Sequence, residues 1–418
     1  MRDLADEVGA LTQGLLAKLE NTDPSSDRWT PINTLGFPRA EVALGPDGEP
    51  CFVVAPAFAA GRIASPPQPV RLIEAADGDI RLENACLTAV LTPGGALRSL
   101  IHHPTGREAL AGEANRIVLF DDRPTAYEAW DIDPFALETA REAPPAHQAS
   151  VVARGPLRAE ARFERRRGKA SARRQTVRLD AGADHLEFDT TLDWRDRRTL
   201  VKAVFPVSYR SPRATYETMF GAVERPTHAN TDADLAMYEV PGHRWADLSE
   251  PGFGVSLLSD ARQGFSVFGG QMALSLVRGP TIPDPTADIG EHRFRYALYP
   301  HIGDWRAADT VAHAARFNRP LGWIAGAPAA ILEASLVTAV PSSVVVDTVK
   351  PAEDGEGWVI RLYESHGGRA WARLAFGVPV KSAWLSNTLE DRLAPLPLEA
   401  GGCSLELRGF QIVTLRLI

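Results

Sequence analysis

Apolar residues in most of the chain recur at every second position, which is the repeat of a β-strand. The segment HLEFDTTLDW places Leu186, Phe188 and Leu192 on one face, while acidic residues occupy the other face. This alternation predicts a strand with one face in a core and the other in solvent. Similar short segments lie near residues 201–208, 253–259, 265–277, 293–299, 343–349, 357–363 and 404–417.

Turn residues separate these segments. The stretch LENACLTAVLTPGGALRSLIHHPTG, residues 82–106, breaks at Pro93, Gly94 and Gly95 between two apolar runs and predicts a β-hairpin. The chain contains 34 glycines and 32 prolines, the residue types that turns require. We therefore expect an all-β protein built from several sheets.

One helix is expected near the N-terminus, because leucine and valine recur at helical spacing within residues 3–20. Two later stretches concentrate proline among small residues: NTDPSSDRWTP at residues 21–31 and ARFNRPLGWIAGAPAA at residues 315–330. Such stretches are typical of linkers. At 418 residues the chain is long enough for two or three domains, and these breaks are where we expect domain boundaries.

The composition is that of a soluble globular protein, with 44% hydrophobic and 23% charged residues. A net charge of -8 gives no support, over the whole chain, for binding nucleic acid or an anionic membrane. Cys51, Cys86 and Cys403 are far apart, so neither a disulfide framework nor a zinc ribbon is indicated. No secretory signal or membrane-spanning segment is evident, and the expected location is the cytoplasm.

A basic run, ARFERRRGKASARRQTVRLD at residues 161–180, is the feature that most suggests a nucleic-acid partner. Its alternation instead favours two strands with exposed basic faces, joined by a hairpin at Gly168. Aromatic residues are not interleaved with the basic ones, as they would be on a surface that stacks bases. We therefore expect no nucleic-acid partner.

The densest group of chemically active side chains lies in RPTHANTDADLAMYEVPGHRWADLSEPGFG, residues 225–254. The preceding segment alternates like a strand, so His228 and Asn230 are expected on a loop at the end of a sheet, where ligand contacts concentrate. These two side chains can bind vicinal hydroxyls, and Arg225 can bind a carboxylate. The alternative is that His228 and Asn230 satisfy buried backbone groups in a long loop.

This stretch does not define an enzyme by itself. Its histidines lack the short spacing typical of a zinc site, so no metal is expected there. Glycoside hydrolysis needs two carboxylates at a defined separation, and the sequence does not show which of its acidic residues face each other. The chain also lacks the serine-hydrolase, phosphate-binding and dinucleotide-binding motifs.

Several segments occur in the order found in one known family, and they extend from about residue 30 onward. They are INTLGFPR (residues 32–39), NRIVLFDDRPTAYEAWDID (115–133), LVKAVFPVSY (200–209) and VKPAEDGEGWVIRLYES (349–365), together with residues 82–110 and 225–254. In these segments and their order, the chain resembles the C-terminal half of glycoside hydrolase family 38 α-mannosidases, of the bacterial and yeast vacuolar type.

The resemblance implies a fold: a galactose-mutarotase-like β-supersandwich flanked by smaller β-domains, with a short N-terminal helix. We expect a helix and linker over residues 1–28 and a small β-domain over 29–75. The supersandwich is expected over 76–325, and a C-terminal β-sandwich over 326–418.

The resemblance also implies zinc-dependent, retaining hydrolysis of terminal α-mannosides through a covalent mannosyl-enzyme. In the family, the nucleophile and the zinc ligands belong to an N-terminal α/β barrel, and no residue of this chain matches those motifs. We therefore expect a C-terminal region that binds a mannose-containing oligosaccharide and depends on a catalytic barrel absent from this chain; a separately encoded barrel is the expected partner. The chain itself is expected to hold no catalytic residue and no metal.

Two loops are implied to face the sugar. One carries Arg225, His228 and Asn230, and the other carries Trp130 and Asp131. The ring of Trp130 can stack on the apolar side of a pyranose, although a place in the core is the alternative.

The chain departs from the family pattern at three places. Tyr127-Glu128 replaces the usual Trp-Asp, Asp232-Ala233 replaces an aromatic-Asp pair, and GDWRAADT at residues 303–310 lacks the usual aromatic-rich continuation. Two other functions therefore stay open. One is a non-catalytic carbohydrate-binding protein, and the other is an aldose epimerase, which shares the supersandwich and uses a histidine acid and a glutamate base.

Overall fold

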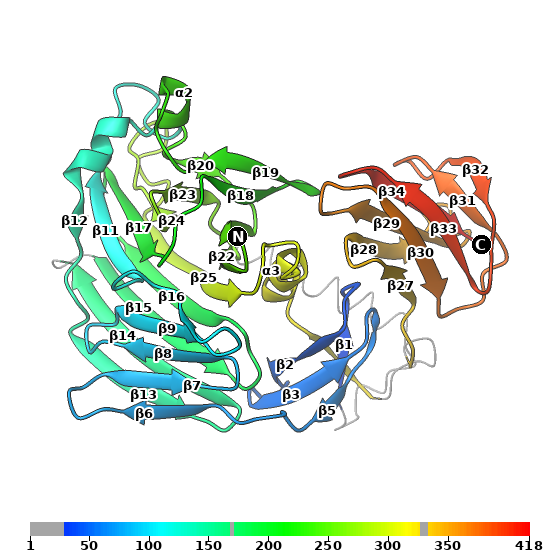
Figure 1. The fold of residues 1–418 in the computed structure, drawn as a ribbon, viewed down its shortest axis with the longest axis horizontal. Coiled ribbons are helices and arrows are strands. Elements are labelled where there is room, and N and C mark those ends of the chain that lie inside the picture. Colours follow the sequence, from blue (N-terminus) through cyan, green and yellow to red (C-terminus); the bar gives the residue numbers. More distant parts are fainter. Residues whose placement is uncertain (1–28, 168–170, 327–332) are drawn as a thin grey trace. The chain divides into compact units, whose positions relative to one another are not determined.

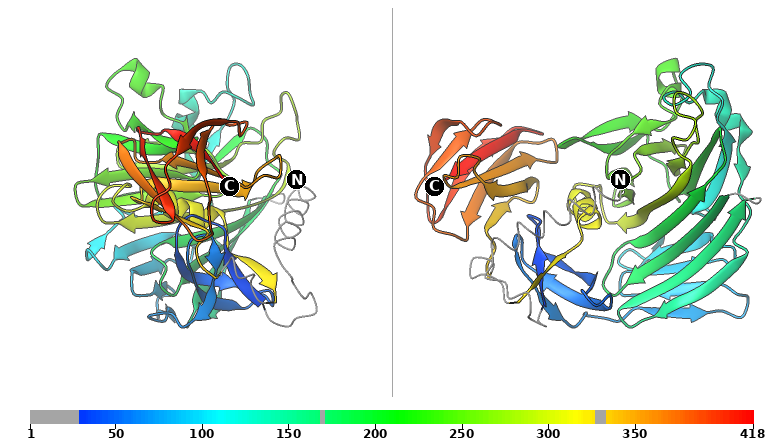
Figure 2. Two further views of the ribbon diagram at one scale, coloured as in Figure 1. Left: turned by 90° about the vertical axis from the view of Figure 1, so that its right-hand side faces the viewer. Right: turned by 180° about the vertical axis from the view of Figure 1, so that it is seen from behind.

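The computed structural model describes residues 29–167, 171–326 and 333–418. The helix expected over residues 3–20 and the turn expected at Gly168 lie outside the described residues. The chain divides into two compact units, drawn from three sides in Figures 1 and 2. Unit 1 combines the N-terminal part as far as Ser65 with Arg319–Ile418, and unit 2 is Pro66–Asn318. Strands dominate both units, so the predicted all-β class is confirmed.

The described residues of unit 2 form three antiparallel sheets. The nine-stranded sheet has the order β13 (Gln148–Arg154), β14 (Arg158–Arg167), β15 (Ser171–Asp180), β16 (Leu186–Trp194), β25 (Gly290–His301), β22 (Phe253–Ser259), β21 (Trp245–Glu250), β18 (Arg213–Thr218) and β19 (Gly221–Pro226). The six-stranded sheet has the order β12 (Arg141–Glu142), β11 (Arg116–Asp121), β17 (Thr199–Pro206), β24 (Gln271–Val277), β23 (Gly264–Phe268) and β20 (Val240–Pro241). The five-stranded sheet has the order β10 (Arg107–Glu108), β9 (Leu97–His102), β8 (Leu87–Leu91), β7 (Ile80–Glu83) and β6 (Arg71–Glu74), and Figure 1 shows β6 and β7 beside β13 and β14.

Buried aromatic side chains join the nine-stranded and six-stranded sheets. The rings of Phe188 and Tyr296 stack with centroids 5.1 Å apart, and the Phe205 ring on β17 lies 5.9 Å from Phe188. All three side chains are fully buried. Because burying one such side chain contributes roughly 2 kcal/mol, these contacts hold the two sheets face to face.

Helices are few and short in the described residues. The α-helix α3 (Thr310–Asn318) packs on β22, while α2 (Asp232–Leu235) and the 3-10 helix η1 (Pro134–Thr139) lie in the connections between strands. Within the described ranges, no helix has the length and apolar character needed to cross a membrane.

The described residues of unit 1 form two small sheets and a two-layered sandwich. The small sheets are β26 (Gly322–Ala325), β1 (Trp29–Asn33) and β4 (Ala59–Ala60), and β2 (Arg39–Leu44), β3 (Pro50–Ala55) and β5 (Arg62–Ala64). One sandwich layer is β27 (Val337–Val340), β30 (Ala370–Phe376) and β33 (Gly402–Leu407), and the other is β28 (Val344–Pro351), β29 (Trp358–Glu364), β34 (Ile412–Leu417), β31 (Ala383–Ser386) and β32 (Arg392–Leu396). Val346, Leu362, Leu374 and Leu415 form part of the shared core of the two layers.

Two strands belong to a different unit from the one that the expected domain ranges would give them. Strand β6 pairs with β7 and therefore belongs to unit 2, although it precedes residue 76. Strand β26 pairs with β1, from Trp29 opposite Ala325 to Ile32 opposite Gly322, and therefore belongs to unit 1. Alternation predicts that a segment is a strand but does not predict its pairing partner.

Individual strands agree with the alternation, with two corrections. Strand β16 and the hairpin of β8 and β9 form as expected. However, the acidic face of β16 is not fully in solvent, because Glu187 is 8% exposed and accepts a hydrogen bond from Arg178 at 2.6 Å. The basic faces of β14 and β15 are not all exposed either, because Arg173 is 7% exposed and points inward.

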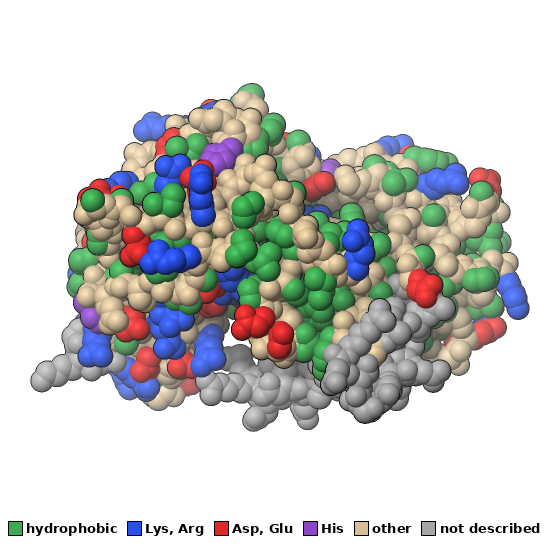
Figure 3. Space-filling view, turned by 90° about the horizontal axis from the view of Figure 1, so that it is seen from below, with side chains coloured by type: hydrophobic (Ala, Val, Ile, Leu, Met, Phe, Trp, Pro, Cys, Tyr) green, Lys and Arg blue, Asp and Glu red, His purple; other side chains and the backbone are tan. Residues whose placement is uncertain are grey.

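Charges of both signs are mixed on the surface. On the face drawn in Figure 3, basic and acidic side chains are interspersed among hydrophobic ones. This mixture agrees with a chain of 45 basic and 53 acidic residues.

Candidate functional site

Two segments of unit 2 that are far apart in sequence meet beside the six-stranded sheet. The first is residues 122–133, between β11 and η1, and the second is residues 227–243, which include α2 and β20. The hydroxyl of Tyr238 donates a hydrogen bond to the carbonyl of Ile132. Figure 1 shows α2 and the 122–133 loop at the same end of unit 2.

Arg278 holds the 122–133 loop in place. Its Nε and Nη2 atoms donate to the two carboxylate oxygens of Asp122 at 2.7 and 3.0 Å, and Asp122 is 1% exposed. The same guanidinium also donates to the carbonyls of Ala129, at 3.2 Å, and Asp131. A two-pronged ion pair of this kind fixes direction as well as distance, so the loop is tied to the end of β24.

Glu128 fixes the middle of the loop. Its carboxylate accepts hydrogen bonds of 2.8 Å from Arg198 Nε and from Thr281 Oγ1. Burial works against ionisation of Glu128, but these hydrogen bonds outweigh it and lower the pKa of the carboxyl below its ordinary value. Glu128 is therefore a charged structural anchor.

The fixed loop presents two aromatic rings to solvent. Tyr127 has a φ of 52°, and its carbonyl accepts hydrogen bonds from the backbone amides of Trp130 and Asp131 at 2.7 and 2.9 Å. Trp130 is 70% exposed and Tyr127 is 71% exposed, with ring centroids 6.5 Å apart and an edge-on angle of 70°. Exposed rings on a fixed loop are suited to stacking on the apolar face of a sugar. Trp130 is thus outside the core, which removes the alternative given above.

A groove of about 360 Å³ lies where the two segments meet. Ile132 from the first segment and Glu239 from the second line it, together with Arg278. This volume is within the range of small-molecule sites. The groove therefore has room for a ligand of the size of a monosaccharide.

The carboxylates that line the groove are engaged within the protein, Glu239 by side chains and Asp288 by the backbone amides of Arg278 and Gly279. The carboxylate of Glu239 accepts hydrogen bonds from the Lys202 ammonium and the Ser275 hydroxyl, and Lys202 is 3% exposed. Burial, followed by the negative charge of Asp133, raises the pKa of the Tyr238 hydroxyl, so this group stays a neutral donor. Such a wall favours a neutral polyhydroxylated ligand over a charged one.

Arg225 lies at the edge of this groove but points into the protein. It is half-buried at the end of β19, donates to the carbonyl of Pro241 at 2.7 Å, and lies with its guanidinium carbon 5.0 Å from the centre of the Tyr216 ring. Burial lowers the pKa of Arg225. Since Pro241 lines the groove, Arg225 positions its wall.

His228 and Asn230 lie on the loop that precedes α2. The Nδ1 atom of His228 is 3.5 Å from a carboxylate oxygen of Asp234, and Asn230 is exposed. Asp234 and Thr231 form the capping box of α2, each accepting a backbone hydrogen bond of 3.1 Å from the other. In the described part of the chain, neither His228 nor Asn230 is among the residues that line the groove.

Two further acidic residues of the 225–254 stretch, Asp247 and Glu250, have structural partners. Asp247 and His301 are both buried and lie 2.8 Å apart, and Ser256 donates to the same carboxylate at 2.7 Å. Glu250 lies 2.6 Å from Arg107. These carboxylates are therefore committed to contacts within unit 2.

The residues present do not fit a zinc ion. Within residues 29–167, 171–326 and 333–418, no group of three His, Cys, Asp or Glu side chains converges, whereas structural and catalytic zinc sites use at least three such ligands.

Sequence reasoning missed most of the groove. Arg278 follows the strand expected over residues 265–277 but was not singled out, and its role follows only from contacts with a loop about 150 positions earlier. Tyr238, Glu239 and Lys202 lie within the segments that resemble the family, but nothing in the sequence indicated that they contribute to or support a groove. A polar residue that ends a buried apolar strand, as Arg278 does, was the available hint.

Known proteins are similar to the whole chain. Residues 82–286 match the family described as Glycosyl hydrolases family 38 C-terminal domain, and residues 343–415 match the Glycosyl hydrolases family 38 C-terminal beta sandwich domain. The Homo sapiens protein named Alpha-mannosidase 2C1 is 37% identical over 439 residues, which cover 100% of this chain and 42% of that protein. The Saccharomyces cerevisiae Alpha-mannosidase is 32% identical over 347 residues, which cover 76% of this chain and 32% of that protein. The chain thus spans less than half the length of these curated relatives.

A solved structure is similar in fold. The crystal structure of an alpha-mannosidase from Enterococcus faecalis V583 has a TM-score of 0.70 with 15% sequence identity, and the match covers 97% of this chain and 52% of that chain. At this identity the likeness shows the fold, and it extends across both units.

Proposed function

Because the chain belongs to glycosyl hydrolase family 38, whose C-terminal domains it carries, we propose that it functions as the C-terminal region of an α-mannosidase. The family resemblance predicted from the sequence is confirmed by both family matches. The observation that carries the functional proposal is the 37% identity to Alpha-mannosidase 2C1 over the full length of this chain. The substrate proposed for the intact enzyme is a mannose-containing oligosaccharide.

The groove beside Trp130 is the proposed sugar contact within this chain. Exposed rings on a fixed loop lie next to its lining, which includes the Ser275 hydroxyl, and Tyr238 binds the carbonyl of the lining residue Ile132. Pyranose recognition uses this combination, since rings stack on C–H groups while polar groups bind hydroxyls. Asp131, exposed next to Trp130, adds a hydroxyl acceptor, while Arg225 positions the wall. His228 and Asn230 have the weaker support: like Trp130 they lie outside the groove lining, and the described contact of His228 is with Asp234 rather than with a lining residue.

The reacting groups are proposed to belong to a catalytic barrel outside these 418 residues, in the same polypeptide or in another chain. The support is that Asp234, Glu239, Asp247 and Glu250 are engaged by partners within unit 2 and that the described residues do not fit zinc. Zinc chemistry would therefore be supplied by that barrel. A cytoplasmic location is part of the proposal and is supported by three free thiols.

Activity measurements test the proposed division of roles. We expect the purified chain with added zinc not to hydrolyse p-nitrophenyl α-mannoside. Adding the part of Alpha-mannosidase 2C1 that lies outside the matched region should yield turnover that depends on this chain. Zinc-dependent turnover by the chain alone would overturn the placement of the catalytic groups. Binding of mannosides without any turnover in the mixture would favour a non-catalytic carbohydrate-binding protein.

Binding measurements test the sugar contact. Removing the ring with Trp130→Ala should weaken the binding of α-mannobiose by roughly tenfold, because about 1.4 kcal/mol of stacking is lost. Trp371→Ala is the matched control, since Trp371 is 68% exposed on β30 of unit 1. Titration calorimetry measures both variants, and equal affinities would remove Trp130 from the site.

A further inference from the structure

The basic hairpin of β14 and β15 places Arg173 in the interior of unit 2 and the half-buried Arg165 beside it. Arg165 and Arg173 are directly opposite each other in the antiparallel register. On β15 every second residue is buried, which includes Ser171, Arg173 and Gln175. Opposite residues on one face of a sheet have Cβ atoms roughly 5 Å apart, so two guanidinium groups share one region between the sheets.

Neighbouring polar groups are satisfied by one another. Gln175 binds Asn115 at 2.8 Å, Thr190 at 2.9 Å and the Tyr296 hydroxyl at 2.7 Å, and that hydroxyl donates to Asn115 at 2.8 Å. These contacts form a closed network, with each member buried. The acceptor atoms of this network are therefore engaged by its own donors, and few acceptors remain for the N–H groups of the two arginines.

The two arginines are not satisfied in this way. Arg173 donates from Nη2 to the Tyr296 hydroxyl at 3.1 Å, while its Nε and Nη1 atoms are buried and have no hydrogen-bond partner among the described residues. Arg165 donates from Nη2 to the carbonyl of Gly94 at 2.6 Å, and its buried Nη1 also lacks a partner there. Burial, with the charge of Arg173, lowers the pKa of Arg165 to about 9, and burial likewise lowers that of Arg173. No carboxylate of the described residues forms an ion pair with either, although buried charges in proteins are normally paired.

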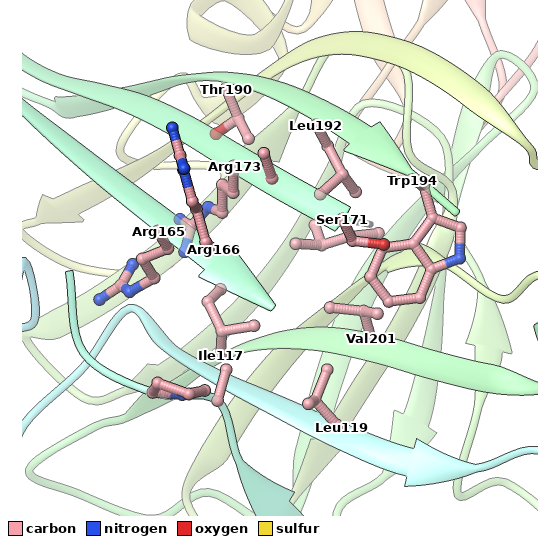
Figure 4. A pocket seen from close by; sticks show the side chains of 14 residues that line it. Ile117, Leu119, Arg165, Arg166, Ser171, Arg173, Thr190, Leu192, Trp194 and Val201 are labelled. Atoms are coloured by element: carbon pink, nitrogen blue, oxygen red, sulfur yellow. The ribbon is translucent and has the colours of Figure 1, made fainter. Parts of the chain in front are cut away.

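A pocket lies beside these guanidinium groups, between the nine-stranded and six-stranded sheets. Its volume is about 50 Å³, and its wall is largely apolar. Figure 4 shows Arg165 and Arg173 toward one side and Leu192, Trp194 and Val201 toward the other. The two sides therefore differ in chemistry, with cations at one end and hydrocarbon at the other.

We propose that this pocket binds a small carboxylate with a short hydrocarbon tail, whose carboxylate lies against the guanidinium groups of Arg165 and Arg173. A guanidinium matches a carboxylate in planar, two-pronged geometry. The tail occupies the apolar side near Leu192 and Trp194. Since one water needs roughly 10–15 Å³ by the same measure, the pocket of about 50 Å³ holds about three to five heavy atoms, as in acetate or propionate.

Calorimetric titration of the 418-residue chain at constant ionic strength tests the proposal. Sodium propionate should bind at one site, and propionamide, which is similar in size but uncharged, should bind at least tenfold more weakly. Affinity should rise roughly threefold to fourfold from acetate to propionate, because the added methylene is buried against hydrocarbon. Inorganic phosphate that binds as tightly as propionate would overturn the proposal, and so would the absence of any binding.

Paired variants assign the binding to the pocket. Arg173→Met should weaken propionate binding at least tenfold, while Arg174→Met, the exposed neighbour on the same strand, should leave it within twofold. Leu192→Phe keeps both arginines but fills the apolar side, so it should abolish the dependence on tail length. Circular dichroism and thermal unfolding establish that each variant is folded. Propionate binding that survives both Arg173→Met and Leu192→Phe would place the ligand elsewhere.

Discussion

Two places in unit 2 gather buried arginine, and they differ in how its charge is compensated. Along the groove, Arg278 binds the carboxylate of Asp122 through two hydrogen bonds and two further carbonyls through its remaining donors. In the inter-sheet pocket, Arg173 has one described partner, the neutral hydroxyl of Tyr296. The first guanidinium is thus a completed structural clamp, whereas the second retains donors suited to an anion.

The difference separates structural charge from ligand-binding charge. A paired arginine beside a groove shapes it and offers no charge to a ligand, which suits a neutral sugar. An arginine with unpaired donors lies in an environment that penalises charge until an anion arrives. Removing a charged side chain should therefore lower the free energy of unfolding at the groove, and should leave it unchanged or raise it at the pocket.

The largest effect is expected from removing the compensating carboxylate in the groove. Asp122→Ala leaves Arg278 without a carboxylate partner, which is the situation of Arg173 in the unmodified chain. This variant should lower the free energy of unfolding by about 3 kcal/mol. Asp121→Ala is the matched control, because Asp121 is exposed and its contact with Arg141 is a surface ion pair of 3.2 Å. The control should cost about 0.5 kcal/mol or less. Urea unfolding measures both, and equal losses would contradict the clamp.

The opposite outcome is expected in the pocket. Arg173→Met removes a buried charge that has no carboxylate partner, so the free energy of unfolding without added carboxylate should stay the same or rise by about 1 kcal/mol. Arg174→Met on the exposed face should change it by about 0.5 kcal/mol or less. Chemical unfolding in a buffer free of small carboxylates makes the measurement. A loss above about 1 kcal/mol in Arg173→Met would mean that its hydrogen bond to Tyr296 outweighs the penalty of burial.

The same comparison shows what the sequence could and could not predict. Alternation in β15 identifies Arg173 and Gln175 as residues of one face, but average polarity assigns that face to solvent. The structure places it inside because Val177 and Leu179 continue the same row into the core. The alternation therefore predicted correctly which residues of β15 share a face, whereas the polarity of those residues predicted wrongly that this face is exposed to solvent.

The groove illustrates a second limit. Its Trp130 was expected from the family resemblance, and its exposure followed from a loop held by Arg278 and Glu128. Those two residues contact partners far from them in sequence, and no local pattern encodes such contacts. The strands were therefore predictable, while the pairing that builds the groove required the tertiary structure.

The smallest effect is expected from Glu128, which sharpens the view that charges around the groove are structural. Because the folded-state pKa of Glu128 is lowered, its ionised form contributes stability above its ordinary pKa, and this contribution is lost as pH falls through the folded-state value. Glu128→Gln should therefore unfold with a weaker pH dependence than the unmodified chain below about pH 5. Glu138→Gln, at an exposed position of η1, should keep the original dependence. Urea midpoints measured from pH 3 to pH 7 test this difference, and parallel curves for all three proteins would show that Arg198 and Thr281 do not hold Glu128 in its charged form.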